Sequence, residues 1–183
     1  SYMFSSTDLR DGSLTLSGLD EWDTSNVINM SGMFYNCGLW ASELNISDLA
    51  NWDTSNVTDM SFMFAFSGNH VEEFKLSGLE DWDVSNVKNM NTMFYGCKKF
   101  NQPLDNWDVS NVKGMEYMFK NCESFNQSLN DWDVSNVTNM SWMFYRCKTF
   151  NQSLKDWDVS NVTEMVEMFY GCTKFNQPLN YWD

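Results

Sequence analysis

Aspartates recur at one fixed place in this chain, directly after a tryptophan. They form a series of seven: Asp23, Asp53, Asp83, Asp108, Asp133, Asp158 and Asp183. Carboxylates can work as catalytic acid–base pairs, hold hard cations, or accept hydrogen bonds inside turns. Catalysis needs one asymmetric set of groups whose pKa values are pushed apart. Seven equivalent positions give the opposite, so the aspartates do not predict an enzyme.

The pattern around each aspartate, D-x-S-N, favours a structural role. An Asp at the start of a turn accepts N–H bonds from the residues that follow it, which is an Asx turn. Two alternatives remain open. The aspartates and the serines two residues later can form an acidic strip for a partner, or stacked oxygens can hold calcium between layers. The sequence has no glycine-rich calcium loop, and we expect no cofactor or metal.

The remaining reactive side chains also favour structural interpretations. The five cysteines, which share one pattern position, are Cys37, Cys97, Cys122, Cys147 and Cys172. Their number is odd and no C-x-x-C pair occurs, so they predict neither a disulfide framework nor a zinc site but buried, reduced thiols. The single histidine, His70, has no recurring Ser or Cys partner for nucleophilic catalysis. The methionines lie in phase with apolar positions and are expected in the core.

Composition narrows the classes of partner. The 183 residues carry a formal net charge of −14, so nucleic acid and anionic membranes are poor partners. Hydrophobic residues make up 43% and aromatic residues 16% of the chain, which is too rich for a disordered protein. No apolar run approaches the roughly 18 residues of a membrane span. The opening, SYMFSSTDLR, falls in the middle of the pattern, which predicts a fragment of a longer protein.

These residues are positioned by a tandem repeat. The Trp-Asp pairs are separated by 30, 30, 25, 25, 25 and 25 residues. The pattern W-D-[TV]-S-N-V-x-x-M-x-x-M-F-x-x-C is followed in later copies by x-x-F-N-Q-x-L. We expect one domain, residues 1–183, with a partial repeat at 1–21, two long repeats over 22–81, four short repeats over 82–181, and a stub at 182–183. Such repeats bury their large side chains only when neighbouring copies stack.

Each repeat predicts one short strand and one helix or helical turn. Val137, Met140, Phe144 and Cys147 are spaced by three, four and three residues, which is the stripe of an amphipathic helix. The preceding Ser-Asn pair is typical of a helix N-cap. Trp132 and Val134 alternate as in a strand. The expected fold class is therefore an α/β repeat solenoid with parallel strands.

The copy NVTNMSWMFYRCKTFNQSLKDWDVS resembles the repeats of mycoplasma lipoproteins and of BspA-like bacterial surface proteins. The match recurs in every copy. This resemblance implies a curved stack like that of the leucine-rich repeats, a location at the cell surface or outside the cell, and a role in adhesion. It carries no catalytic residues to this chain.

Two functions follow as hypotheses. The first is a non-catalytic protein-binding or adhesion module that contacts a protein or a host surface ligand; the second is a structural spacer that displays another domain. Specific binding needs a locally distinctive set of side chains, and aromatic and Arg side chains most often anchor interfaces. Variation between repeats is concentrated away from the predicted sheet, and the candidate contact residues there are Trp40, His70, Tyr95, Lys120, Tyr145 and Arg146.

Overall fold

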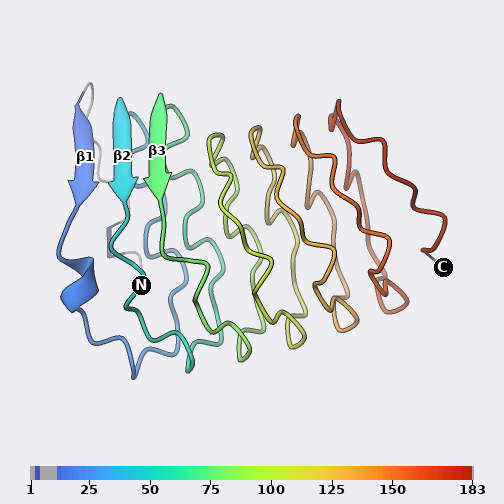
Figure 1. Ribbon diagram of the computed structural model, residues 1–183, viewed down its shortest axis with the longest axis horizontal. Helices are drawn as coiled ribbons and strands as arrows, with labels where there is room; N and C mark the ends of the chain where they lie inside the picture. Colours follow the sequence, from blue (N-terminus) through green and yellow to red (C-terminus); the bar gives the residue numbers. More distant parts are fainter. Residues whose placement is uncertain (1–2, 5–11, 183) are drawn as a thin grey trace.

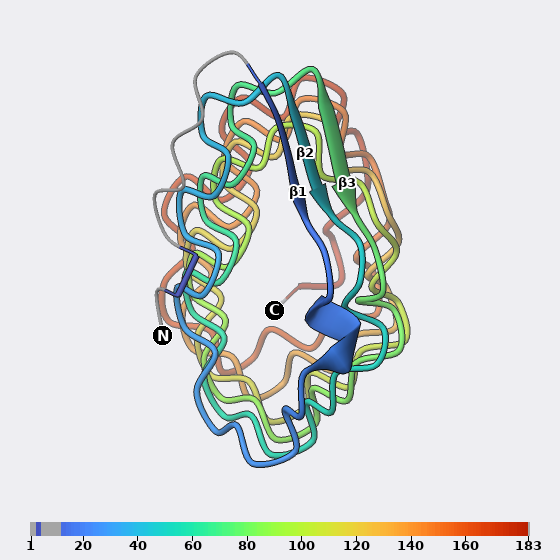
Figure 2. The same ribbon diagram turned by 90° about the vertical axis from the view of Figure 1, so that its left-hand side faces the viewer.

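The computed structural model describes residues 3–4 and 12–182. The chain winds into coils that lie side by side along the long axis of the molecule (Figure 1). Seen along the stack, the coils form a long, narrow ring (Figure 2). The regular elements are β1 (Ser13–Leu16), the 3-10 helix η1 (Leu19–Glu21), β2 (Glu43–Ile46) and β3 (Glu73–Leu76). No helix in the described part of the chain is long and apolar enough to cross a membrane.

The three strands form one parallel sheet in the order β1-β2-β3. Their register is uniform, with Leu16 opposite Ile46 and Ile46 opposite Leu76. They arise in the partial first repeat and in the two long repeats, where an apolar alternation before the Trp-Asp pair buries Leu44, Ile46 and Leu76 against the core. The prediction of parallel pairing between repeats is confirmed here, although the strands lie in a different segment from the one expected.

The prediction of a helix-plus-strand solenoid was wrong. No α-helix occurs among the described residues, and the Trp-x-Val segments form no strand. The segment expected to be helical is instead a run of tight turns after an isolated parallel bridge, such as the one between Asn89 and Gly114. Positive φ angles, which an α-helix does not contain, recur at two pattern positions. They are Gly32, Phe62, Thr92, Tyr117, Trp142 and Glu167, and then Asn36, Phe66, Gly96, Asn121, Arg146 and Gly171.

Backbone hydrogen bonds explain why turns form there. Met63 donates its N–H to the carbonyl of Met60 at 3.2 Å, which closes a turn of the i to i+3 kind. Phe62, between them in the chain, donates its N–H to the carbonyl of Asn91 in the next coil at 3.0 Å. Alternate N–H groups therefore bond between coils, whereas an α-helix would direct every N–H to residue i−4 of its own segment.

The apolar spacing cannot distinguish the two structures. Turns that close every three or four residues bring Val57, Met60, Phe64 and the next inward residue, Ser67, to the same side of the chain, as a helix does. The Ser-Asn pairs predicted to cap helices have another partner: the Asn136 side chain donates to the carbonyl of Ser110 in the previous coil at 2.8 Å.

The core consists of columns of equivalent side chains, as the repeat predicts. The longest column contains the Met-Phe phenylalanines Phe34, Phe64, Phe94, Phe119, Phe144 and Phe169. Neighbouring ring centres in it are 5.2 to 5.7 Å apart, with interplanar angles of at most 7°. Trp107 and Trp132 stack at 6.4 Å in a parallel column. The Trp132 indole also donates to the buried carbonyl of Leu104 at 2.9 Å, so one side chain joins packing and hydrogen bonding between coils.

Candidate functional site

The aspartate ladder comprises Asp23, Asp53, Asp83, Asp108, Asp133 and Asp158, and all six side chains are exposed. Asp183, the seventh member of the series, lies outside the described residues. Each carboxylate accepts an N–H bond from the serine two residues later, for example from Ser25 to Asp23 at 3.1 Å and from Ser135 to Asp133 at 3.0 Å. The predicted Asx turns are therefore confirmed, and one carboxylate oxygen of each member already has a structural partner.

The hydrogen bonds also stabilise the ionised form of the carboxylates. The Ser25 and Ser55 hydroxyls each donate to the preceding aspartate at 2.6 Å, and these bonds lower the pKa of Asp23 and of Asp53. The hydrogen bonds from Ser160 lower the pKa of Asp158 in the same way. Proton exchange near neutral pH, which an acid–base role requires, is therefore disfavoured at these positions.

An acidic hollow of about 390 Å³ lies beside this ladder and is lined by Asn130, Asp131, Trp132, Asp133, Asp156 and Asp158. Asn130 donates to Asp156 across it at 2.5 Å. Within the described residues, no group of three or more His, Cys, Asp or Glu side chains is arranged to hold a metal ion. The hollow is therefore an acidic surface without a defined ligand cage.

The F-N-Q asparagines form a second hydrogen-bonded ladder between coils. The Asn101 side chain accepts the N–H of Asn126, and the Asn126 side chain accepts the N–H of Asn151, both at 2.8 Å. Gln127 adds a bond to the carbonyl of Asn101 at 3.1 Å. These amides satisfy turn backbone between coils and leave little for a ligand.

The cysteines are free, and four of the five are buried. Cys122 and Cys147 point their thiols at the carbonyls of Phe94 and Phe119 at 3.0 Å. Burial raises the pKa of both thiols, and it raises the pKa of the half-buried Cys172 to about 11. Protonated thiols are poor nucleophiles and metal ligands, so the column is a packing feature.

The run of turns lies on the side of the coils across from β1–β3 (Figure 2). The aromatic side chains of this run contact one another from coil to coil. We call this surface the aromatic strip. It consists of Tyr35, Phe62, Phe66, Tyr95, Tyr117, Lys120, Trp142, Tyr145, Arg146 and Tyr170. Phe62 and Tyr170 are 39% and 56% exposed, and the other rings are half-buried. Half-buried aromatic side chains combine contact area with little loss of conformational freedom on binding.

Lys120 sits at the centre of the aromatic strip. Its ammonium lies 5.4 Å from the ring centre of Tyr95 and 4.8 Å from those of Tyr117 and Tyr145. The reason is positional: Lys120 occupies the place that tyrosine holds in the repeats before and after it. Each cation–π contact contributes about 0.5–1 kcal/mol at an exposed site. Burial also raises the pKa of the Tyr117 hydroxyl, with a smaller contribution from the charge of Glu116.

Four of the six predicted contact residues, Tyr95, Lys120, Tyr145 and Arg146, meet in the aromatic strip. Trp40 and His70 form a separate stacked pair, with ring centres 4.2 Å apart, on the loops that lead into β2 and β3.

Sequence reasoning missed Tyr117, Trp142 and Tyr170. Tyr117 and Trp142 stack at 4.8 Å and have φ angles of 59° and 56°, a conformation that bulky side chains seldom adopt. Both occupy a pattern position that varies between repeats, and this variation was the available signal.

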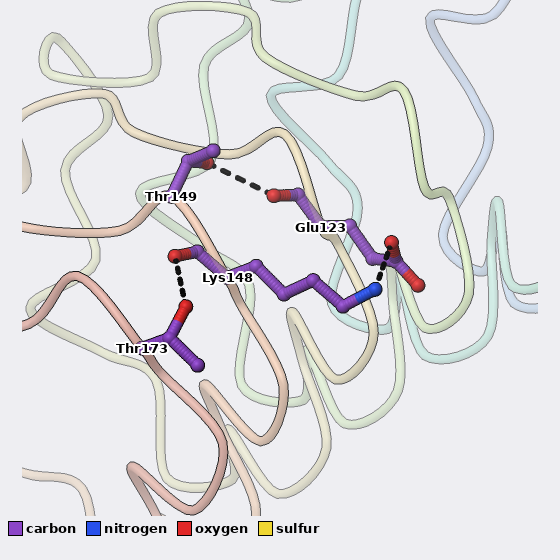
Figure 3. Close-up of polar contacts among 4 residues, drawn as sticks. All are labelled: Glu123, Lys148, Thr149 and Thr173. Atoms are coloured by element: carbon purple, nitrogen blue, oxygen red, sulfur yellow. Dashed lines mark hydrogen bonds and ion pairs between the residues drawn. The ribbon is translucent and has the colours of Figure 1, made fainter.

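A groove borders the aromatic strip at Arg146 and Tyr170. It measures about 530 Å³ and is lined by Lys98, Asn121, Glu123, Arg146, Lys148, Tyr170, Gly171 and Thr173. Most of these residues directly precede or follow the buried cysteines. Figure 3 shows polar contacts of three of these lining residues: Lys148 pairs with Glu123 at 2.6 Å, and Thr173 donates to the Lys148 carbonyl at 3.2 Å. Thr149 donates to the Glu123 carbonyl at 3.0 Å.

The fold and this surface define a repeat protein with two long surfaces. One is the aspartate ladder, whose carboxylates are hydrogen-bonded within their own turns, and the other is the aromatic strip. Residues 1–69 and 65–182 match the family model described as "Mycoplasma protein of unknown function, DUF285". The chain belongs to that family. No curated protein and no solved structure matches this chain.

Proposed function

We propose that this chain is a non-catalytic protein-binding module of a bacterial surface protein and that the aromatic strip is its contact surface. One observation carries the proposal: the repeated polar groups are used within the fold, whereas the strip presents rings and two cations that differ from coil to coil. Tyr, Trp and Arg are the side chains most enriched at energetically important interface positions. Because these residues vary along the stack, the strip presents a distinctive set of side chains that one partner can recognise specifically.

The aspartate ladder is proposed to modulate binding without specifying it. Its members repeat the same environment, and each is hydrogen-bonded to its own turn. Exposed rows of like charge alter association rate and salt dependence more than affinity. A catalytic role has no support, since equivalent carboxylates do not provide the distinct acid and base that catalysis needs.

The cell surface, or the space outside the cell, is the proposed location. The mycoplasma family supports a bacterial setting, and the resemblance to BspA-like repeats supports adhesion. The fold corrects one implication of that resemblance, because the described coils consist mostly of turns, with the short strands β1–β3 and no α-helix. Buried thiols suit an oxidising environment, since burial shields them from oxidants.

A structural spacer remains the second candidate, and the regularity of the ladders favours it. Asn86, Asn111, Asn136 and Asn161 each donate to the carbonyl of a serine in the previous coil at 2.8 Å. A stack with such regular bonds between coils holds its two ends at a constant separation, as a spacer must. A spacer, however, does not need the varied rings of the strip.

Two triple variants test the proposal. The wild-type chain is measured by biolayer interferometry against a panel of purified extracellular-matrix and host-membrane proteins. Replacing Tyr95, Tyr145 and Arg146 by Ala is expected to weaken any specific interaction at least about tenfold, as the loss of interface anchors does. Replacing Asp108, Asp133 and Asp158 by Asn should leave it within a few-fold.

The reverse result places the contact surface on the aspartate ladder. If the panel and a random-peptide display library both yield no ligand for the folded chain, the spacer function replaces binding. Circular dichroism of each variant confirms that the fold is retained.

A further inference from the structure

The charged residues of this acidic protein are unevenly distributed. Six basic residues fall in the short stretches from the Met-Phe pair to the following F-N-Q, namely Lys98, Lys99, Lys120, Arg146, Lys148 and Lys174. The aspartate ladder lies at the other turn of each coil, after the tryptophan. The edge beside the aromatic strip is therefore locally basic, against a net charge of −14 for the whole chain.

The groove concentrates this local charge. It contains three cationic side chains, Lys98, Arg146 and Lys148, and one carboxylate, Glu123. Lys148 neutralises Glu123 at 2.6 Å. Among the described residues, no carboxylate lies within ion-pair distance of Lys98 or Arg146, which leaves two positive charges uncompensated in a concave site.

Arg146 is held in place by its surroundings. Its guanidinium lies 5.2 Å from the ring centre of Tyr145. The backbone N–H of Arg146 donates to the backbone carbonyl of Tyr170 at 2.7 Å, which fixes the main chain from which the side chain extends. A guanidinium fixed against a ring presents its planar set of donors to a carboxylate at low entropic cost. Asn121 and Lys98, on the same lining, add an amide and an ammonium as further polar groups.

We infer that this groove accepts an acidic peptide segment of the partner protein, with Arg146 and Lys98 as its carboxylate-binding groups. This inference rests on the binding function proposed above. Charge complementarity argues for an anion, because binding there neutralises the two uncompensated cations. Continuity with the strip argues for a peptide, since Tyr170 belongs to both surfaces and gives the segment an apolar neighbour.

The size of the groove sets the length of that segment. Its lining includes the residue after the cysteine in four successive coils, from Lys98 in the first to Thr173 in the fourth. At a coil separation of about 4.8 Å, this span is about 15 Å. An extended chain covers this distance with about five residues.

The test uses fluorescein-labelled peptides that carry a run of about five Glu, Gln or Lys residues, a length set by the groove. Fluorescence anisotropy with the wild-type chain should show tighter binding of the Glu peptide than of the other two, despite the acidic protein. The double variant Lys98→Gln, Arg146→Gln should lose about tenfold or more of this affinity, as removal of close charge pairs does.

The matched control is Lys75→Gln, Lys155→Gln. It changes the net charge by the same amount but removes cations that lie outside the groove, in exposed pairs with Glu73 and Asp156. Its affinity for the Glu peptide should stay within about twofold, because exposed charges act weakly over a distance. Equal losses in the two double variants would show an effect of overall charge and overturn the inference.

Two further outcomes separate this inference from the proposed function. If the Glu peptide binds no better than the Gln peptide while Tyr95, Tyr145 and Arg146 remain essential for a panel protein, the groove assignment fails and the binding function stands. If hyaluronate oligosaccharides bind through Lys98 and Arg146 and the Glu peptide does not, an acidic glycan replaces the peptide as ligand.

Discussion

Asn121 provides a sharp test of the turn structure, because glycine and alanine there have opposite effects in a turn and in a helix. Asn121 has a φ angle of 62°, and the equivalent residues of the adjoining repeats are Gly96 and Arg146, which also have positive φ. Both substitutions remove the same side chain beyond Cβ. The difference between Asn121→Gly and Asn121→Ala therefore reports the backbone conformation.

The expected magnitude follows from two terms. A left-handed conformation costs an ordinary L-residue about 1–2 kcal/mol. Glycine lowers the free energy of unfolding by about 0.4–1 kcal/mol relative to alanine, because it gives the unfolded chain more conformational freedom. The Gly variant should therefore unfold with a free energy about 0.5–1 kcal/mol higher than the Ala variant. In a helix, Ala would be the more stable by about 1 kcal/mol.

Urea unfolding followed by far-UV circular dichroism measures this difference, provided that the two variants share one m-value. The same pair of substitutions at Lys120, which is not among the residues of positive φ, serves as control and should favour Ala. A more stable Ala variant at Asn121 would refute the turn assignment for this segment.

Three further predictions concern the core, the thiols and pH. Trp132→Ala should lower the free energy of unfolding by about 3–5 kcal/mol because it opens a cavity and leaves the Leu104 carbonyl unpaired, and Trp182→Ala should cost less because its ring is only half-buried. Urea midpoints compare the two, and equal losses would contradict stacking between neighbours. Cys122 should resist iodoacetamide in the native state and react in urea, since burial keeps its pKa high; mass spectrometry detects labelling, and rapid native labelling would disprove burial. Hydrogen bonds lower the pKa of Asp53, so its ionised form adds stability above the unfolded-state pKa that disappears as the pH falls through the folded-state pKa. The melting-temperature gap between wild type and Asp53→Asn should therefore narrow from pH 7 to about pH 3, and an unchanged gap would contradict this linkage.

The candidate site was only partly predictable. Variation between repeats identified Tyr95, Lys120, Tyr145 and Arg146, because residues at equivalent positions stack in successive coils. Trp142 and Tyr117 share a second variable pattern position, and the prediction overlooked it although the same signal was present there. The groove beside Arg146 was also not predictable, because the sequence does not show that the residues on either side of the cysteines line a concave surface.

The sequence by itself determined the repeat, the inward positions and the polar ladders. Periods of 30 and 25 residues place equivalent side chains in register, so the phenylalanine and tryptophan columns and the Asx turns follow from local chemistry and repetition. Only the tertiary structure decided between helix and turn. Both bury a residue every three or four positions, and they differ in whether an N–H such as that of Phe62 bonds within its own segment or to Asn91 of the next coil. That choice depends on a neighbour 29 residues away, and local spacing contains no information about it.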